Sequence, residues 1–380
     1  MENATLVDKK QKVYLAPVAI AKFYGFCPTV SPSVIKLDLE GTKGYDETVC
    51  PHEFAAIIRN YTETRQNMLP QPILEWMDRP FPGSGERKRP MRLEGSLLSI
   101  GSTKPICECL SIEAALSLLA SLGYKDLEVR LNSIGDKDSA QDFEKKTLNY
   151  LKKSMSTFPA DLRGELKKDH FALIKSRKEE WLPFRSCSPK PLDFLTESSR
   201  LHFKEILEFL EIRNIPYSID DSLIVDPKFA SEAVIAIVTK DGEEVARGIR
   251  VNRLAKKLGH KKEVPLFKLD ISVKLKKAVK EVKDKSEKPR FYLIQFGPEA
   301  KLKSFLVLHE LYRAQVPLIH SIVKDKLGSQ IGVAESSGIP YIILLGQKEA
   351  LENSVVLRNA FTRAQEIVPI SQLADKVKSL

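Results

Sequence analysis

The sequence lacks several features that would identify a compartment directly. It has no uninterrupted apolar run long enough to span a bilayer, and its first residues, MENATLVDKKQKVYLAP, lack the charged-then-apolar layout of a secretory signal. The five cysteines are odd in number and scattered along the chain, which is typical of a protein in the reducing cytosol. We therefore expect a cytoplasmic protein without a membrane partner.

Metal-binding and catalytic motifs are also missing. Cys107 and Cys109 form a C-x-C pair, but no second pair of cysteines or histidines follows at zinc-ligand spacing, and the six histidines are isolated. No GxxxxGK[ST] or GxGxxG phosphate loop, no GxSxG elbow and no HExxH helix occurs. We predict no metal site, and motif chemistry alone identifies no catalytic centre.

The positive charge of the chain is unevenly distributed. The formal net charge is +10, and the segment from Lys256 to Arg290 holds thirteen Lys or Arg against five Asp or Glu. A local basic stretch of this kind is typical of a protein that meets phosphate backbones. A solvated Lys/Glu-rich linker has the same composition, so both interpretations stay open.

The length of 380 residues and the 43% hydrophobic content predict two or three domains with substantial cores. The Lys-rich segment KLKKAVKEVKDKSEKP has the composition of an interdomain linker. We therefore expect a core at 1–275, which includes an insertion around 140–195, then a basic linker at 276–289 and a separate domain at 290–380.

Within the core, apolar periodicity predicts helices at 51–68, 111–122 and 196–212, with Ser111 as the N-cap of the second. The segment SEAVIAIVTKDGEEVARGI predicts a hairpin that turns at Asp241-Gly242, and a further helix is expected to begin at Asp136 or Asp138. Residues 78–95 are rich in proline, glycine and charge, which predicts a loop.

After residue 290, buried-type strands alternate with helices. FYLIQFG, VPLIHSI and IPYIILLG are expected strands, and helices are expected between and after them. This alternation predicts a compact α/β domain of about 90 residues with a largely parallel sheet.

The segment VARGIRVNRLAKKLGHKKEVP, residues 245–265, has the strand–turn–helix layout of a phosphate-binding turn. An isolated Gly248 and a following Arg250 stand at its centre. A plain basic connection has the same composition, and local sequence does not separate the two.

The order of several segments resembles that of histidyl-tRNA synthetases over nearly the whole chain. These segments are IAKFYGFCPTVSP, LNSIGDKDSAQDFEKKTLNYL, SSRLHFKEILEFLEIRNIPY, RVNRLAKKLGHKKEVP and the C-terminal α/β unit. The resemblance implies an α+β class II synthetase-like core with an antiparallel sheet. Pro32, which matches the proline of the first class II motif, implies a homodimer.

The C-terminal unit resembles the anticodon-binding domain shared by the His, Gly, Thr and Pro synthetases. The shared features are Gln330 with Ala334 on one helix, the run SSGIPYIILLGQKE, and Arg358 with Gln365. This resemblance implies tRNA as a partner. The residues that it implies for tRNA binding are Gln330, Glu349, Arg358, Gln365 and Lys326.

The second and third motifs of the class depart from the family pattern. Where the family has an arginine for the ATP α-phosphate, this chain has Phe81-Pro82-Gly83-Ser84, although Arg87, Arg89 and Arg92 follow. Where the third motif supplies small residues and an arginine that stacks on adenine, this chain offers Lys268 and Lys274, and an ammonium group lacks a planar face.

The histidine-specific stretches depart as well. The family's Arg-Gly-Leu-Asp-Tyr-Tyr run is replaced by Val225-Asp226-Pro227-Lys228-Phe229-Ala230. The family's glycine-rich substrate loop keeps Gly248 and Arg250, the candidate substrate-binding remnants, but gains the β-branched Ile249 and Val251. The resemblance therefore predicts a weakened site for histidine activation, in which Arg250 is the remaining candidate for a catalytic or substrate-binding residue.

Three functions follow from the resemblance. The favoured one is a synthetase-like protein that binds tRNA through its C-terminal domain and has weakened or lost histidine activation. The alternative is an active, divergent histidine–tRNA ligase that uses ATP and Mg²⁺, its active site realigned around residues 70–95. A histidine-sensing subunit of a biosynthetic complex is the third, but such subunits usually lack an anticodon-binding domain.

Overall fold

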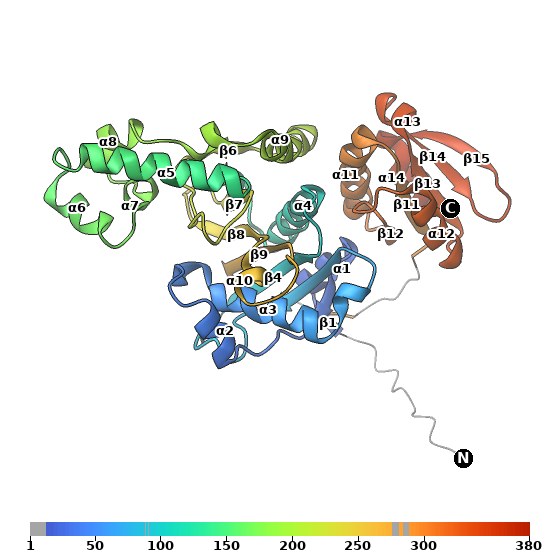
Figure 1. Cartoon of the computed structure of the whole chain (residues 1–380). Helices are drawn as coiled ribbons and strands as arrows, with labels where there is room; N and C mark the ends of the chain where they lie inside the picture. Colours follow the sequence, from blue (N-terminus) through green and yellow to red (C-terminus); the bar gives the residue numbers. More distant parts are fainter. Residues whose placement is uncertain (1–12, 88, 90, 276–280, 284–288) are drawn as a thin grey trace, which may run out of the picture. The chain divides into compact units, whose positions relative to one another are not determined.

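The computed structural model describes residues 13–87, 89, 91–275, 281–283 and 289–380 (Figure 1). The chain divides into two compact units. One unit contains Phe26–Leu116 and Tyr124–Lys274. The other contains the residues up to Gly25, Ser117–Gly123 and the residues from Leu275 onward.

An eight-stranded sheet forms the centre of the first unit, in the order β2-β3-β4-β9-β8-β7-β5-β6. Its middle pairings are antiparallel, and only the edge pairings β2–β3 and β5–β6 are parallel. The strands are β2 (Cys27–Thr29), β3 (Ile73–Asp78), β4 (Arg92–Ile100), β5 (Glu128–Ser133), β6 (Tyr217–Ile219), β7 (Ala233–Val238), β8 (Glu244–Val251) and β9 (Leu266–Lys274). This architecture confirms the expected antiparallel-sheet core.

The strand register places two rows of side chains on one face of this sheet. The first row runs Arg130, Ala236, Arg247, Asp270, Ser96 and Met77 across β5, β7, β8, β9, β4 and β3. The second row runs Asn132, Val234, Ile249, Lys268, Leu98 and Glu75 across the same strands. Because successive strand residues alternate between faces, Gly248 and Arg250 point to the opposite face.

Each face of the sheet is covered by a helix. Helix α3 (Pro51–Glu63) contributes Phe54, Ile57 and Ile58 to a core that also contains Ile249, on the face of the two rows. Helix α4 (Ile106–Ser121) supplies Glu108 to Arg250 on the other face. The remaining helical segments in this part of the chain are α2 (Lys36–Gly41), η1 (Glu47–Val49), η2 (Gln66–Met68) and α10 (Leu254–Lys257).

Residues 137–212 form a largely helical region. Asp136 caps α5 by accepting a hydrogen bond from the backbone N–H of Ser139, and Thr196 caps α9 in the same way through Ser199. A separate small core holds the short helices together through Leu162, Leu173 and Trp181. The elements are α5 (Lys137–Ser154), α6 (Ala160–Leu166), α7 (Ala172–Lys175), η3 (Glu179–Trp181), α8 (Leu182–Ser186), η4 (Pro191–Phe194) and α9 (Glu197–Ile212).

The C-terminal part of the second unit is a five-stranded sheet in the order β12-β11-β13-β14-β15. Helix α12 packs on one face against Tyr292, Ile294 and Ile342, while α11 contacts β11, α13 and α14. The elements are β11 (Phe291–Gln295), α11 (Pro298–Arg313), β12 (Leu318–His320), α12 (Leu327–Ser336), β13 (Tyr341–Leu345), α13 (Gln347–Leu351), β14 (Ser354–Asn359), β15 (Gln365–Pro369) and α14 (Ile370–Lys378).

The same unit includes three elements near its N-terminal and linker segments: β1 (Val13–Leu15), α1 (Ala16–Phe23) and β10 (Glu281–Lys283). β1 and β10 pair antiparallel. Most of the basic segment expected to be a linker, 276–280 and 284–288, lies outside the described residues.

Some local predictions are confirmed. The hairpin forms as β7 and β8, with Gly242 at a φ of 81° in the turn, and the helix expected at 196–212 is α9. The N-cap at Asp136 also forms.

Other local predictions are wrong for identifiable reasons. Helix α4 begins at Ile106, so Ser111 is no N-cap, and its hydroxyl donates to the Cys107 carbonyl inside the helix. Strand β4 begins at Arg92 within the expected loop, because pairing with β9 extends it. The C-terminal sheet is half antiparallel, since the unpredicted strands β14 and β15 pair that way.

Candidate functional site

The face of the sheet that carries the two rows has two charged side chains at its centre. Lys268 and Asp270 lie two residues apart on β9, so both point to this face, and the Lys268 ammonium donates to Asp270. The Lys268 side chain has no exposed surface. A buried ammonium needs compensating carboxylates, because desolvation penalises the isolated charge.

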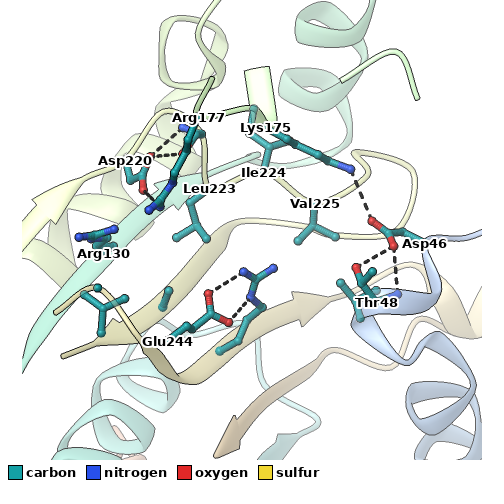
Figure 2. Close-up of a pocket in the computed structure, with 16 residues that line it drawn as sticks. Asp46, Thr48, Arg130, Lys175, Arg177, Asp220, Leu223, Ile224, Val225 and Glu244 are labelled. Carbon is teal, nitrogen blue, oxygen red and sulfur yellow. Dashed lines mark hydrogen bonds and ion pairs between the residues drawn. The ribbon is translucent and has the colours of Figure 1, made fainter. Parts of the chain in front are cut away.

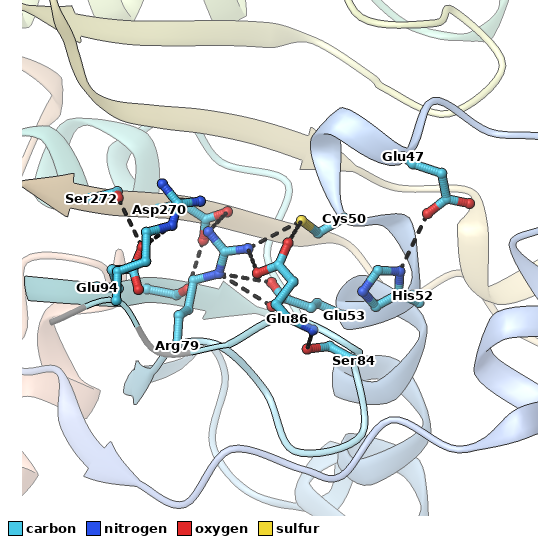
Figure 3. Close-up of polar contacts among 12 residues, drawn as sticks. Glu47, Cys50, His52, Glu53, Arg79, Ser84, Glu86, Glu94, Asp270 and Ser272 are labelled. Atoms are coloured by element: carbon cyan, nitrogen blue, oxygen red, sulfur yellow. Dashed lines mark hydrogen bonds and ion pairs between the residues drawn. The ribbon is translucent and has the colours of Figure 1, made fainter. Parts of the chain in front are cut away.

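Glu53 and Arg79 complete the pairing (Figure 3). Glu53 comes from the first turn of α3, and one of its carboxylate oxygens lies 2.8 Å from the Lys268 ammonium. Arg79, which follows β3, places Nε 3.0 Å from the same Glu53 oxygen and Nη1 3.4 Å from Asp270. The four side chains form a buried network that we call the ion-pair cluster.

The charges in this network affect one another. Burial alone would lower the pKa of Arg79, but Asp270 and Glu53 outweigh burial and raise it. Burial would raise the pKa of Asp270, but the Lys268 and Arg79 charges lower it. Arg79 and Asp270 are therefore both ionised at neutral pH.

Cys50 and Glu86 lie at the border of the ion-pair cluster. Burial raises the pKa of the Cys50 thiol to about 12, so the sulfur stays protonated and donates to a Glu86 oxygen at 3.2 Å. Glu86 also lies 3.6 Å from Arg79. The thiol is therefore not a thiolate nucleophile at neutral pH.

Counting these groups gives two cations, Arg79 and Lys268, against three carboxylates, Glu53, Asp270 and Glu86. Both cations are already paired within the protein. In the part of the chain that the structure describes, no group of three His, Cys, Asp or Glu is arranged to hold a metal ion. The cluster as it stands therefore offers an anionic ligand no unpaired cation.

Arg250, the predicted substrate-binding remnant, lies on the opposite face of the sheet. Its guanidinium is fully buried, pairs with both oxygens of Glu108 on α4, and donates to the Ser102 carbonyl at 2.6 Å. His202 Nε2 lies 3.2 Å from the same carboxylate. A ligand on the face of the ion-pair cluster does not reach Arg250.

Gly248 points to the same side as Arg250. A Cβ atom at this position would lie 2.7 Å from the Phe267 ring of the neighbouring strand, which is too close for a side chain. The glycine therefore allows the ring to pack against β8, which is a structural reason for its presence. Its predicted contact with a substrate stays a prediction.

The segments matched to the family's activation motifs are packed into the protein. Phe81 is buried, Pro82 accepts a hydrogen bond from the Val34 backbone, and a side chain at Gly83 would collide with the Val34 carbonyl. Arg87 is exposed, and Arg89 lies 3.6 Å from Glu94.

The segment 225–230 is a turn rather than an open binding loop. Asp226 accepts a hydrogen bond from the Lys228 backbone, while Phe229 is buried with its ring centroid 5.2 Å from that of Phe54. This turn fills the space beside α3 with an aromatic contact.

The predicted tRNA-binding residues occupy different environments in the C-terminal unit. Gln330 is buried, and its amide accepts from the Gln295 backbone at 3.1 Å and donates to the Gln295 carbonyl at 2.8 Å. Glu349 accepts from the Gly346 backbone at the start of α13, and Lys326 is exposed just before α12.

Arg358 and Gln365 lie side by side. They are register partners in β14 and β15, and Arg358 also pairs with Ile342, a residue of the sheet face covered by α12. Gln365 is exposed and Arg358 is half-buried. The structure therefore brings these two predicted residues together on one surface.

Sequence reasoning missed several residues that gather on the face of the ion-pair cluster. Arg79 stands between an acidic strand end and a proline, Glu53 lies in the first turn of a helix, and Arg247 directly precedes Gly248. The only available signal was the period-two pattern of β8 and β9, which places Arg247 with Asp270 and separates both from Arg250.

The comparisons with known proteins agree with this architecture. The anticodon binding domain family matches residues 299–380. Curated relatives include a histidine–tRNA ligase of Listeria monocytogenes, 24% identical over 350 residues, and one of Acholeplasma laidlawii, 26% identical over 348. The first alignment covers 88% of this chain and 81% of the relative, and the second covers 88% and 82%.

Among solved structures, apo histidyl-tRNA synthetase of S. aureus is similar in fold, with a TM-score of 0.52 and 19% identity. The match covers 94% of this chain and 92% of that chain. No helix among the described residues is both long and apolar enough to cross a bilayer.

Replacing Arg250 with alanine is expected to lower the free energy of unfolding by about 3–5 kcal/mol at neutral pH, because Glu108 then stays buried without its cation. Urea unfolding followed by circular dichroism measures this loss. Arg200→Ala, which removes an exposed arginine of α9, is the matched control and is expected to stay within about 0.5 kcal/mol of the unmodified chain.

The effect of Arg250→Ala is also expected to depend on pH. Burial would raise the pKa of Glu108, but the Arg250 and His202 charges lower it from 4.5 to about 2. A depressed carboxyl pKa contributes stability above the unfolded value of about 4.5, and this stability is lost as the pH falls towards about 2. The difference between the two chains should therefore narrow on acidification; a constant difference would contradict the ion-pair explanation.

Proposed function

We propose that this chain, which is similar to histidyl-tRNA synthetases over most of its length, binds tRNA through its C-terminal domain, and that its capacity to activate histidine is weakened or lost. The ion-pair cluster is the observation that carries this proposal. It occupies the sheet face on which a class II core would hold its substrates.

The composition of the cluster opposes a triphosphate. Lys268 lies in the segment matched to the third motif, which in the family supplies small residues and an arginine, and its side chain is held there as a buried ion pair with Glu53. The two cations of the cluster are paired with its two carboxylates, and Glu86 at its border adds a third carboxylate, so a triphosphate would meet no net positive charge. These residues do not fit ATP with Mg²⁺ in their present arrangement.

The missing donors add to this effect. Loss of one preorganised donor to a developing charge commonly costs about 3–4 kcal/mol, or roughly 10²–10³ in rate. The second motif has lost its arginine at Phe81–Ser84, and the buried Arg250 is committed to Glu108. Even non-additive losses at several positions would leave little adenylation.

The C-terminal domain supports the other half of the proposal. It matches the anticodon binding domain family over 299–380, and the structure leaves Lys326 and Gln365 exposed and Arg358 partly so. We assign these three residues to RNA contact. Gln330 and Glu349 support these residues indirectly. Their side chains accept hydrogen bonds from the backbone of Gln295 and Gly346 and so fix the fold of the domain.

A homodimer and a cytoplasmic location are part of the proposal. Large apolar side chains are exposed around the motif 1 proline Pro32, which is unusual for a monomer surface and is typical of an interface. They are Val30, Ile35, Leu37 and Leu39, with Met68 and Leu69 at the end of η2. The five cysteines, all of them free, support a reducing compartment.

An active ligase is the competing function. The observation in its favour is that curated relatives covering 88% of this chain are named histidine–tRNA ligases. ATP and Mg²⁺ would then be its cofactors, and the ion-pair cluster would have to open when substrate binds.

Histidine-dependent exchange of pyrophosphate into ATP separates the two functions. We expect exchange by this chain at least about 10³-fold below that of the Listeria monocytogenes ligase assayed in parallel, because several donors are missing at once. Exchange within tenfold of that ligase would overturn the loss of activation.

Binding of tRNA is expected to weaken steeply with salt, since phosphate contacts release counterions. Arg358→Gln should weaken binding and lower the salt slope by about 1, as measured by filter binding over a salt series. Arg313→Gln, at the exposed end of α11, is the matched control and should leave the slope unchanged. A flat salt response of the unmodified chain would contradict tRNA binding.

Leu37→Asp is expected to convert a dimer into a monomer, because a charge at an apolar interface is desolvated without a partner. Light scattering coupled to size-exclusion chromatography measures the mass. Leu351→Asp places the same change on an exposed leucine of α13 and should not alter it. A monomeric unmodified chain would remove the dimer from the proposal.

A further inference from the structure

A hollow lies on the sheet face that carries the row from Arg130 to Met77, and Figure 2 shows residues that line it. This cavity of about 290 Å³ is bounded by β5, β7 and β8, by the segment 220–225, and by residues around Thr48. We call it the Arg130 pocket. No residue matched to the ATP motifs of the family lines it, whereas Val225, the first residue of the stretch matched to the histidine-specific run, does.

The sequence explains why the pocket is empty of side chains. In the row across the sheet, Ala236 stands between Arg130 and Arg247, so a methyl group separates two long side chains. Leu223 and Val225 supply an apolar wall, as Figure 2 shows. The pocket therefore combines an apolar side with a cationic rim.

Charged side chains of both signs line the pocket. Four cations face three carboxylates. The cations are Arg130, Lys175, Arg177 and Arg247, and the carboxylates are Asp46, Asp220 and Glu244.

Three of the four cations are paired closely. Arg247 makes two hydrogen bonds to Glu244, at 2.7 and 2.6 Å. Arg177 bonds Asp220 at 2.9 Å. Lys175 lies 2.8 Å from Asp169 and 3.5 Å from Asp46.

Arg130 is the exception. Its Nε makes a single long contact of 3.4 Å with Glu128, a residue that does not line the pocket. Within the described part of the chain, no hydrogen bond involves its two terminal nitrogens. Its side chain is 22% exposed, and Arg130 is among the residues that line the pocket. A planar guanidinium with two free N–H groups matches the two oxygens of one carboxylate.

We propose that the Arg130 pocket binds a small monocarboxylate with an apolar body. The carboxylate pairs with Arg130, and the apolar body contacts Leu223, Val225 and Val238. The apolar wall favours an acid with an apolar body over inorganic phosphate, which could not cover that wall. This inference goes beyond the proposed function, since it requires neither tRNA nor histidine activation.

Isothermal titration of the full-length protein with phenylacetate and 3-phenylpropionate tests the proposal, with phenylacetamide as the neutral analogue. We expect saturable binding of at least one acid, and at least about tenfold weaker binding of the amide, because hydrogen bonds to a charged group are the stronger kind. Arg130→Gln should weaken binding of the acid by a similar factor. Arg200→Gln, on the exposed side of α9, should leave it unchanged.

A second variant separates pocket filling from loss of charge. Ala236→Leu places a larger side chain between the two arginines and should abolish binding while Arg130 is retained. Thermal unfolding of each variant shows whether the fold is kept. If Ala236→Leu unfolds, the comparison of acid binding by Arg130→Gln and Arg200→Gln still tests the role of Arg130.

Several outcomes would overturn the proposal. They are no saturable binding of either acid, equal binding of acid and amide, undiminished binding by Arg130→Gln, or inorganic phosphate binding more tightly than both acids. All of these results are independent of pyrophosphate exchange and of tRNA binding, so failure of this proposal and failure of the proposed function are distinguishable.

Discussion

Successive residues of a β-strand point to opposite faces of a sheet, and in β8 and β9 this constraint decides the chemistry of the whole core. It places Arg247 with Lys268 and Asp270 on one face, and Arg250 with Gly248 on the other. The first face therefore carries the ion-pair cluster and the charged residues of the Arg130 pocket. The second holds a sealed arginine–glutamate pair that stabilises the packing of α4 on the sheet.

The ion-pair cluster and the Arg130 pocket follow from what each position on the first face carries. At Lys268 a long cation fills the space, so the carboxylates of Glu53 and Asp270 must converge to compensate its charge away from water. At Ala236 a methyl group leaves the space open, and the neighbouring arginines become the rim of a cavity. The lysine at position 268 therefore closes one part of this face, and the alanine at position 236 leaves another part open.

The C-terminal domain is built independently of these constraints. Its buried Gln330 ties the end of β11 to α12, and its hairpin of β14 and β15 presents Arg358 beside Gln365. A domain of this kind can keep an RNA-binding surface while the core changes, because the two surfaces share no side chain. This separation is the physical basis of the proposal that tRNA binding is kept while histidine activation is weakened or lost.

The sequence by itself determined the class II resemblance, the departure of the activation motifs, and the local elements with strong signals, such as the Asp136 cap and the Asp241-Gly242 hairpin. These follow from residue order and short-range hydrogen bonding, which act within a few positions of the chain. Only the tertiary structure decided that Arg250 is committed to Glu108 and that Glu53, Arg79 and Lys268 meet. Strand register brings together residues far apart in the chain, and neither composition nor local periodicity encodes which of them will face each other.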